Sequence, residues 1–311
     1  MAYRIYDYSN THVFHRKALL NAVEMVNAEH PGSEDVLVIV SARNMLKALF
    51  LVMLTSQKTV VNLVGFGRLF SNFGPLGRLI FDLVVKLYGW FSAKAFIVEH
   101  DVDYNYLKGL TTTPIYTSHG SGLDIEGFTR APKQRGDSLK MGYLSRFHPS
   151  KGSDQILKAA KTLPEDRELI IAGWDIRGNK YAKAFSAIAD TLPNVTFLGK
   201  LNSRSEVSAF FNNIDLFLSP SVREGGNIAL QEGIWHGVPF ITTDAPGCKT
   251  LAERFGGLAV PIEQFSTYLL GDLMVFPMDI DQQDWDHLIQ PFLSIMVENE
   301  LKHIFSDIMR Q

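Results

Sequence analysis

Short apolar segments alternate with helical stretches along this chain, and the first series of them fills the N-terminal half. The series begins with the strand YRIYDYS near the N-terminus and continues with residues 35–40, 59–64, 93–100 and 114–120. Segments this rich in Val, Ile and Leu are typical of strands buried on both faces, which occur in parallel sheets covered by helices. The first half is therefore expected to form an α/β domain.

A second series follows a polar stretch, Ala131–Ser138, which contains Pro and Gly and is the best linker candidate. Its strands are expected at residues 139–145, 167–173, 194–199, 214–221 and 239–247, the last as a strand and turn. Its helices are expected at residues 153–163, 181–192, 203–212 and 227–236. This pattern predicts a doubly wound domain, in which ligands bind beyond the carboxyl ends of the strands.

The length of 311 residues suits two domains. We expect an N-terminal domain over residues 1–133 and a second domain over residues 134–282. The last segment, 283–311, has the apolar spacing of an amphipathic helix and is expected to pack back on the first domain.

The overall composition excludes some functions. The formal net charge is −3 and the pI about 6.3, which argues against a general nucleic-acid binder. A single cysteine, Cys248, excludes an intrachain disulfide and suits a reducing, cytoplasmic compartment. The first residues contain no apolar region of the signal-peptide type, so we expect no signal peptide.

The segment from Arg43 to Lys94 is basic and apolar, and Asp82 is its only acid. Within it, Met45–Leu54 is too short to span a bilayer and predicts a buried or interfacial helix. A second helix is expected from about Leu76 to Phe91. Two interpretations stay open: peripheral contact with an anionic membrane surface, at the inner face of the membrane, or a core helix with solvated cations.

Two loops that follow strands contain candidate site residues. In SRFHPSKG, the cations Arg146 and Lys151 stand near the start of a helix, a combination that suits a diphosphate. Taken alone, two solvated surface cations would be the simpler interpretation. A third loop, residues 242–251, is either a turn that closes the site or an ordinary turn.

The loop REGGNIALQE contains a pair of glutamates around a helix start. Gly225 and Gly226 allow close approach of a ligand, and the helix that begins near Asn227 and Ile228 offers amides to an anion. Glu224 lies in the loop, where a carboxylate suits a sugar ring. Glu232 lies within the helix, where it suits the ribose hydroxyls. Alternatively, both glutamates are solvated surface residues.

Four segments together, LSRFHPSKG, FLGKL, SPSVREGG and EGIWHGVPFITTDAPGC, resemble the retaining glycosyltransferases of the GT-B fold, in particular glycosyltransferase family 4 of the lipid-linked glycan and polysaccharide-assembly type. The resemblance covers about residues 139–253 and implies two Rossmann-like, doubly wound domains facing across a cleft.

The same resemblance assigns roles to individual residues. Glu224 and Glu232 match the family's pair of glutamates separated by seven residues, and Arg146 and Lys151 match its diphosphate ligands. Gly199 and its neighbour Lys200 would meet the base through their backbone.

The N-terminal half resembles the acceptor domain of the same family less closely. It implies acceptor-side roles for the loop with Gly65 and Gly67 and for His119. Two departures stand out: the first strand lacks the following Gly-rich loop, and no histidine occurs between Asn62 and Gly67. The domain is also short for the family.

The resemblance implies a retaining transfer of a hexosyl or N-acetylhexosaminyl group from a UDP-sugar to a glycan or lipid-linked glycan in surface polysaccharide synthesis. Neither a cofactor nor a metal is expected, because Arg146 and Lys151 would stabilise the leaving diphosphate. Two alternatives stay open. One is a nucleotide-sugar epimerase of the same fold, and the other is a non-catalytic subunit that binds a nucleotide-sugar.

Overall fold

The chain divides into two compact units in a computed structural model. The first comprises Met1–Asp124 with Pro291–Gln311, and the second comprises Ile125–Gln290. The structure describes residues 2–6, 13–29, 35–63, 67–120, 122–132, 136, 138–175, 178–222, 224, 227–271 and 282–310.

The first unit is built on a five-stranded parallel sheet whose spatial order β1-β2-β3-β4-β5 follows the chain. Its strands are β1 (Ala2–Tyr6), β2 (Asp35–Val40), β3 (Thr59–Leu63), β4 (Ala93–Val98) and β5 (Ile115–Thr117). The central strands β2 and β3 consist almost entirely of buried residues, as expected for strands covered on both faces.

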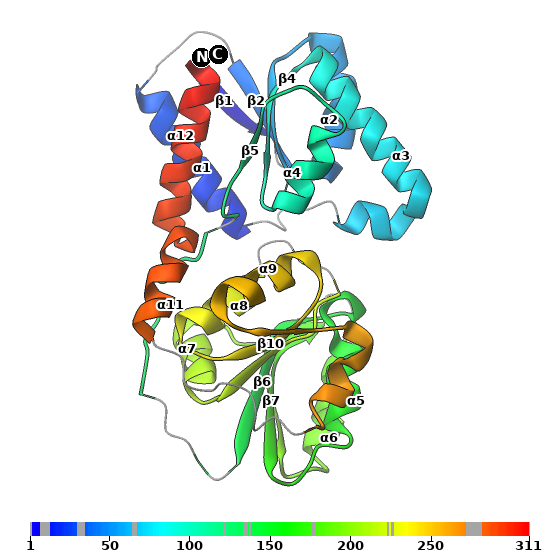
Figure 1. Ribbon diagram of the computed structural model, residues 1–311, viewed down its shortest axis with the longest axis vertical. Coiled ribbons are helices and arrows are strands. Elements are labelled where there is room, and N and C mark those ends of the chain that lie inside the picture. The colour runs from blue at the N-terminus through cyan, green and yellow to red at the C-terminus, as the bar shows by residue number, and fades with distance from the viewer. Residues whose placement is uncertain are drawn as a thin grey trace. The chain divides into compact units, whose positions relative to one another are not determined.

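Helices cover both faces of this sheet (Figure 1). On one face, α1 (Val13–Glu29) packs against α12 (Ser294–Arg310), and their apolar residues share a core with Val38 and Val60. On the other face lie α2 (Ala42–Thr55), α3 (Gly67–Phe91) and α4 (Asp101–Lys108), whose core includes Val61 and Phe96. Alternate residues of one strand thus face opposite helix layers.

Helix α3 is interrupted near its start. Gly74 has φ 54° and ψ −139°, and Pro75 follows it. Proline disfavours a helical conformation in the residue before it and removes a backbone donor. The regular part of the helix therefore begins near Leu76, as the sequence predicts, and a preceding helical segment extends back to Gly67.

The second unit contains a six-stranded parallel sheet in the order β11-β10-β9-β6-β7-β8. Its strands are β6 (Leu139–Phe147), β7 (Arg167–Asp175), β8 (Val195–Gly199), β9 (Leu216–Ser219), β10 (Phe240–Thr243) and β11 (Leu258–Val260). From β6 the chain builds outward in one direction to β8, then returns to the other side of β6 with β9. The order of the strands therefore reverses between β6 and β9.

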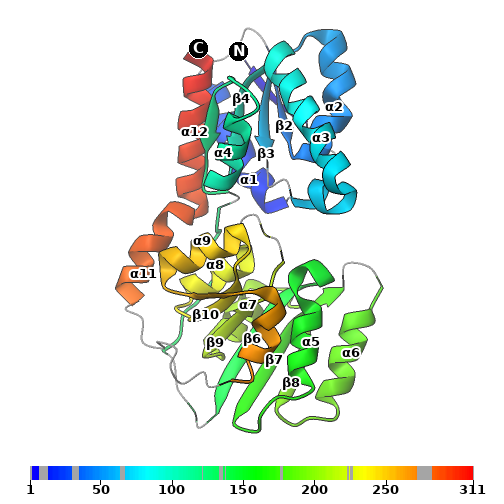
Figure 2. The ribbon, with the colours of Figure 1, turned by 45° about the vertical axis from the view of Figure 1, so that its right-hand side comes forward.

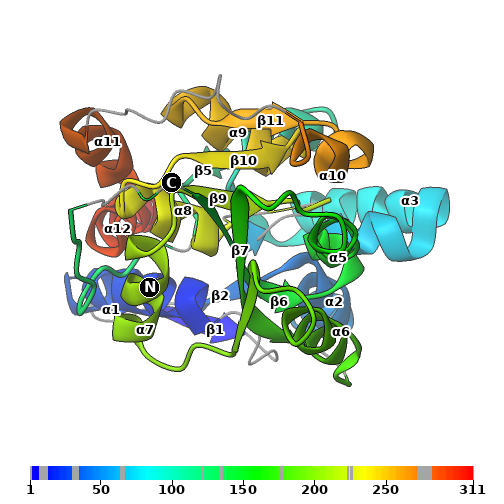
Figure 3. The same ribbon diagram turned by 90° about the horizontal axis from the view of Figure 1, so that it is seen from below.

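Figures 2 and 3 show helices on both faces of this second sheet. The helices are α5 (Ser153–Ala160), α6 (Lys180–Ala189), α7 (Arg204–Asn212), α8 (Ile228–Trp235), α9 (Pro246–Phe255), α10 (Phe265–Tyr268) and α11 (Gln282–Ile289). Helices α5, α6 and α10 share a core that contains Phe185 and Phe265. On the other face, Phe211 of α7 packs on Phe217 of β9 with ring centroids 5.2 Å apart.

One sequence expectation needs correction here. The segment with Pro246 and Gly247 was expected to be a turn, but both residues belong to α9. Proline is tolerated at the first position of a helix, where its missing N–H would have no helical partner. No described helix is both long and apolar enough to cross a bilayer.

Candidate functional site

The candidate site lies at the carboxyl ends of β6 and β9, the two neighbouring strands between which the order of the second sheet reverses. Loops that leave such a pair turn toward opposite faces of the sheet and leave a crevice between them. The loops with Lys151 and Glu224 follow these two strands. Topology alone therefore brings two of the predicted site residues together.

The loop after β6 holds Lys151 by its backbone. A short 3₁₀ helix, Pro149–Lys151, begins after His148, whose ring nitrogen Nδ1 accepts from the Ser150 amide at 3.2 Å. The buried Tyr143 hydroxyl donates to the Lys151 carbonyl at 3.1 Å and also contacts the Ser153 hydroxyl at 2.9 Å. The Lys151 side chain consequently extends from a fixed turn.

Gly152 explains why this loop can approach β9 so closely. It has φ 69°, and a Cβ atom at this position would lie 2.0 Å from the carbonyl oxygen of Pro220. Only glycine tolerates both the conformation and the contact. The amide of Val222 then donates to the Ser150 carbonyl at 3.0 Å and ties the two loops together.

Lys151, Ser221 and Glu224 form the centre of the site. The Lys151 ammonium donates to Oε1 of Glu224, and the Ser221 hydroxyl donates to the same oxygen at 2.6 Å. The side chains of Lys151 and Glu224 are only 18% and 9% exposed. A largely desolvated ion pair at the end of a sheet is able to exchange partners with an entering anion.

Asn227 forms the start of α8. It adopts the left-handed conformation with φ 35°, and its Oδ1 accepts from the Leu230 amide at 3.4 Å. Its Nδ2 donates to the Ser219 hydroxyl at 2.8 Å and to the Cys248 sulfur at 3.4 Å. Asn227 thus joins β9, α8 and α9. The amides of Ile228 and Ala229 come before the first helical hydrogen bonds, where an anion is favourably placed.

Glu232 lies one turn further along α8 than Ile228 and in a different environment from Glu224. Burial raises its pKa to about 7, and the opposing charge of Arg204, at the start of α7, moderates that rise. Arg204 itself lies over the Phe128 ring at 4.8 Å. The carboxyl group of Glu232 therefore titrates near neutral pH, where a small change in its surroundings alters its charge.

Apolar side chains gather at the adjacent ends of β7 and β8. Trp174 and Leu198 are 39% and 48% exposed, and the Lys200 ammonium lies 5.2 Å from the Trp174 ring centroid. Gly199 has φ 70° and no heavy atom within 4 Å of the place its Cβ would occupy. Arg146, on β6, pairs in register with Trp174 and is partly buried. A flat ring would find an apolar support here.

Several predicted site residues lie outside this cluster. Gly65, Gly225 and Gly226 fall outside the described residues. Gly67 is the first residue of α3 in the first unit. His119, also in the first unit, is held by Glu300 of α12, which accepts from its amide at 2.9 Å and contacts its ring Nδ1 at 3.1 Å.

The carboxyl edge of the first sheet contains polar residues that the sequence analysis did not single out. Asn62, at the end of β3, is fully buried, and within the described residues neither its Oδ1 nor its Nδ2 has a hydrogen-bond partner. Burial, with a contribution from Asp103, raises the pKa of Glu99 to about 8. Polar residues inside TVVNLV and at the end of AFIVEH were the available signal.

The described ranges contain no candidate metal site. No group of three or more His, Cys, Asp or Glu side chains is placed there to hold an ion. Cys248 is buried and free, and burial raises the pKa of its thiol to about 11.

Residues 124–265 match the family model described as glycosyl transferases group 1. The matched segment contains the whole Lys151–Glu224 cluster and Glu232. A little under half of the chain is therefore similar to the group 1 glycosyltransferases.

Curated relatives are similar to a part of the chain of comparable length. Protein CapJ of Staphylococcus aureus is 28% identical over 148 residues, which are 45% of this chain and 34% of that protein. The GDP-mannose-dependent alpha-mannosyltransferase of Mycolicibacterium smegmatis is 27% identical over 161 residues, 48% of this chain and 40% of its own length. The matches thus span well under half of these relatives.

Solved structures resemble the chain over nearly its full length. Sucrose-phosphate synthase from Thermosynechococcus elongatus gives a TM-score of 0.71 at 13% identity, covering 98% of this chain and 81% of that one. HepE from Anabaena, in complex with UDP and glucose, gives 0.67 at 15% identity, covering 92% and 81%. At such identities the likeness concerns the fold alone, and it confirms the expected class of two Rossmann-like domains.

Proposed function

We propose that this chain is a retaining glycosyltransferase that moves a hexosyl or N-acetylhexosaminyl group from a UDP-sugar to a glycan or lipid-linked glycan. The observation that carries the proposal is the Lys151–Glu224–Ser221 cluster at the strand reversal of the group 1 domain. It supports the proposal because a cation suits a phosphate and the neighbouring carboxylate suits the hydroxyl groups of a sugar ring.

The reaction requires stabilisation of the negative charge that develops on the departing diphosphate. Lys151 supplies a cation from one loop, and the first amides of α8 supply donors from the next. Arg146 adds a second cation from the end of β6. Preorganised donors of this kind take the place of a metal ion, so the proposed reaction needs neither a metal nor a cofactor.

The two glutamates have separate roles in the proposal. Glu224 accepts hydrogen bonds from hydroxyl groups of the donor sugar and orients it beside Lys151. Glu232, when ionised, accepts hydrogen bonds from the ribose hydroxyls, while Trp174 and Leu198 support the base and the backbone at Gly199 and Lys200 meets its edge.

The acceptor belongs to the first unit in this proposal. His119 follows β5, and Gly67 begins α3, the helix that comes after β3, so both belong to the carboxyl edge of that sheet, where ligands of such sheets bind. The proposed role is in surface polysaccharide synthesis at the cytoplasmic face of a membrane, where a glycan acceptor is built on a lipid. The solved HepE structure, which has the same fold, contains UDP, the nucleotide named in the proposal.

The test measures donor binding and transfer in Lys151→Ala and Glu232→Ala. Both variants should bind the donor at least tenfold more weakly, because each loses about one hydrogen bond to a charged group. Unchanged donor affinity in both would remove the site assignment. A binding comparison of UDP-, GDP- and CMP-sugars identifies the nucleotide, because a relative that is 27% identical over 161 residues is named for GDP-mannose.

The two alternative functions give different outcomes in the same experiments. An epimerase converts the donor to an epimer without an acceptor, whereas a transferase leaves its sugar unchanged apart from slow hydrolysis. A non-catalytic subunit binds the nucleotide-sugar and releases nothing until a partner protein is added. Product analysis with and without acceptor separates the three.

A further inference from the structure

The outer side of α3 is apolar, although α3 is a surface helix. Its inner residues, among them Phe81 and Tyr88, fill the core of the first unit. On the opposite side, Leu79, Leu83 and Trp90 are 67%, 58% and 81% exposed, and their spacing of four and seven residues places them in one stripe. Surface helices ordinarily carry polar residues on that side.

Helix α2 repeats the pattern. Phe50 and Leu54, one turn apart, are 74% and 69% exposed, whereas Met45 and Ala48 are buried on the inner side. Helices α2 and α3 pack side by side on the same face of the sheet, so their outer sides point the same way (Figure 2). We call the exposed residues Phe50, Leu54, Leu76, Leu79, Leu83 and Trp90 the α2–α3 surface.

The segment that forms the α2–α3 surface is rich in cations. Residues 43–94 contain seven basic residues and one acid, Asp82, in a chain whose net charge is −3. Asp82 accepts a hydrogen bond from the Tyr106 hydroxyl, so part of its charge is engaged within the unit. The exposed residues Lys47 and Lys86 lie on α2 and α3, respectively. Charge of this sign attracts anions to an otherwise apolar face.

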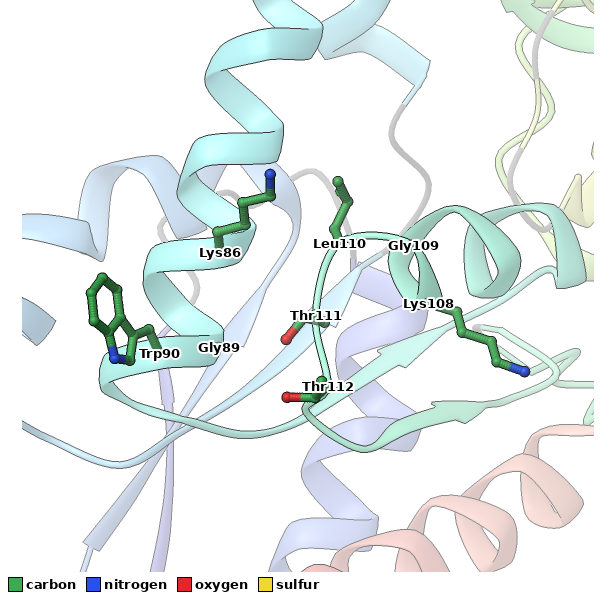
Figure 4. Close-up of a pocket in the computed structure, with 8 residues that line it drawn as sticks. All are labelled: Lys86, Gly89, Trp90, Lys108, Gly109, Leu110, Thr111 and Thr112. Atoms are coloured by element: carbon green, nitrogen blue, oxygen red, sulfur yellow. The ribbon is translucent and has the colours of Figure 1, made fainter.

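An open pocket of about 460 Å³ lies at the Trp90 end of the surface (Figure 4). Lys86 and Trp90 of α3 border it on one side, and the loop 108–112 borders it on the other. The polar groups of its lining include the ammonium of Lys86 and the hydroxyls of Thr111 and Thr112. An indole beside a cation is typical of residues at the headgroup level of a membrane.

We propose that the α2–α3 surface docks on an anionic lipid bilayer, with the leucines among the acyl chains and an anionic headgroup in the pocket beside Lys86 and Trp90. The apolar residues would be buried as deeply as those of an interfacial helix, and the cations would remain at the level of the headgroups. A second copy of the chain is a poorer occupant, because the same excess of positive charge would face itself. The inference is independent of the site in the second unit.

The test uses the full chain with vesicles of phosphatidylcholine, with and without phosphatidylglycerol, and measures the bound fraction by flotation. We expect binding to the anionic vesicles that weakens as salt is added. Leu79→Ser with Leu83→Ser should weaken it at least tenfold. Lys86→Gln should weaken vesicle binding about fivefold, because it removes one cation near a charged surface.

Matched controls use exposed residues elsewhere. Ile295→Ser removes an apolar side chain that is 58% exposed on α12, and Lys161→Gln removes an exposed cation of the second unit. Both should bind vesicles as the natural chain does. Binding of the nucleotide-sugar, measured in every variant, reports that the fold is intact and stays unchanged even where vesicle binding is lost.

Three results would overturn the proposal: equal binding to neutral and anionic vesicles, binding unaffected by the paired leucine substitutions, or a dimer in solution that the same substitutions convert to a monomer. The last result would assign the α2–α3 surface to a second copy. Light scattering at the concentration of the vesicle assay measures the oligomeric state.

Discussion

The Lys151 ammonium is bound by the Glu224 carboxylate at the reversal point of the second sheet, although 73 residues separate them in the chain. The Ser221 hydroxyl contacts the same carboxylate oxygen, and neither charged side chain is more than 18% exposed. The Glu224 carboxylate is therefore paired with Lys151, the cation that we assign to the diphosphate of the donor. Binding of a phosphate there must compete with Glu224 or share Lys151 with it.

Replacing Glu224 separates affinity for the nucleotide from transfer. In Glu224→Gln the competing charge is gone, so a nucleoside diphosphate should bind about tenfold more tightly. Transfer should fall by about a hundredfold or more, because in the proposed mechanism Glu224 orients the donor sugar. Calorimetry with UDP and a transfer assay give the two quantities. Glu253→Gln, an exposed carboxylate of α9, is the control and should change neither. Weaker UDP binding in Glu224→Gln would contradict the competition.

The same pair also contributes to stability. Lys151→Met leaves a mostly buried carboxylate with only Ser221 as its hydrogen-bond donor among the described contacts, and should lower the free energy of unfolding by about 2 kcal/mol. The double variant with Glu224→Gln should recover most of that loss. Urea denaturation of the two single variants and the double variant measures the coupling, and purely additive effects would show that the pair does not interact in solution.

The strands were predictable from sequence because they are buried on both faces. The run Asp35–Val40 has the bounds of β2, since each of its apolar residues packs against a helix layer. The strand order within a sheet then places the loops of β6 and β9 together. The location of Lys151 and Glu224 at one edge of the sheet follows from the pattern alone.

The contact between Lys151 and Glu224 could not be predicted from the sequence. It depends on the approach of the Gly152 backbone to Pro220, a tertiary distance with no local signature. The structural role of Asn227 depends likewise on Cys248, which lies 21 residues further along the chain. Asn62 escaped notice because an amide within TVVNLV does not interrupt a strand pattern.

The titration of Glu232 predicts a pH dependence of stability. Its folded pKa, about 7, lies above the ordinary value of 4.5, so the folded chain holds a proton that the unfolded chain releases. The stabilising contribution is therefore complete below pH 4.5 and disappears as the pH rises through 7. Relative to Glu232→Gln, the free energy of unfolding of the natural chain should fall by at most about 3 kcal/mol as the pH rises over this range. Urea titrations at several pH values measure the difference, and parallel curves for the two chains would refute it.

Donor affinity should change in the opposite sense to stability. In the proposed role, the ionised form of Glu232 accepts hydrogen bonds from both ribose hydroxyls, so binding of a nucleotide-sugar should strengthen as the pH rises through about 7. The diphosphate of such a donor stays fully ionised in this range and adds no titration of its own. Calorimetry between pH 6 and 8 gives the affinities, and Glu232→Gln should show no such dependence.

Gly152 and Gly256 provide a matched pair that isolates the close approach of the two loops. Their backbones are nearly identical, with φ 69° and ψ 20° against φ 68° and ψ 21°, but no heavy atom lies within 4 Å of a Cβ at Gly256. Gly256→Ala should cost about 1 kcal/mol, the strain of the left-handed conformation. Gly152→Ala adds the clash with the Pro220 carbonyl and should cost about 3 kcal/mol.

Nucleotide binding distinguishes the same two variants. Displacement of the loop in Gly152→Ala moves Lys151 away from the site, so UDP should bind at least tenfold more weakly. Gly256→Ala should bind UDP normally. Equal stability losses in the two variants, or normal binding in Gly152→Ala, would show that the loops adjust without moving Lys151.

The buried amide of Asn62 should destabilise the fold. Neither of its polar atoms has a partner within the described residues, so Asn62→Leu, of similar size, should raise the free energy of unfolding by about 1–2 kcal/mol. Asn44 is the matched control, because it is also buried and donates to the Val40 carbonyl at 2.8 Å. Asn44→Leu should lower stability by a comparable amount. If Asn62 instead binds the acceptor, Asn62→Leu will be both more stable and defective in transfer at limiting acceptor, with donor affinity unchanged. A loss of stability in Asn62→Leu would show that the amide has a structural role.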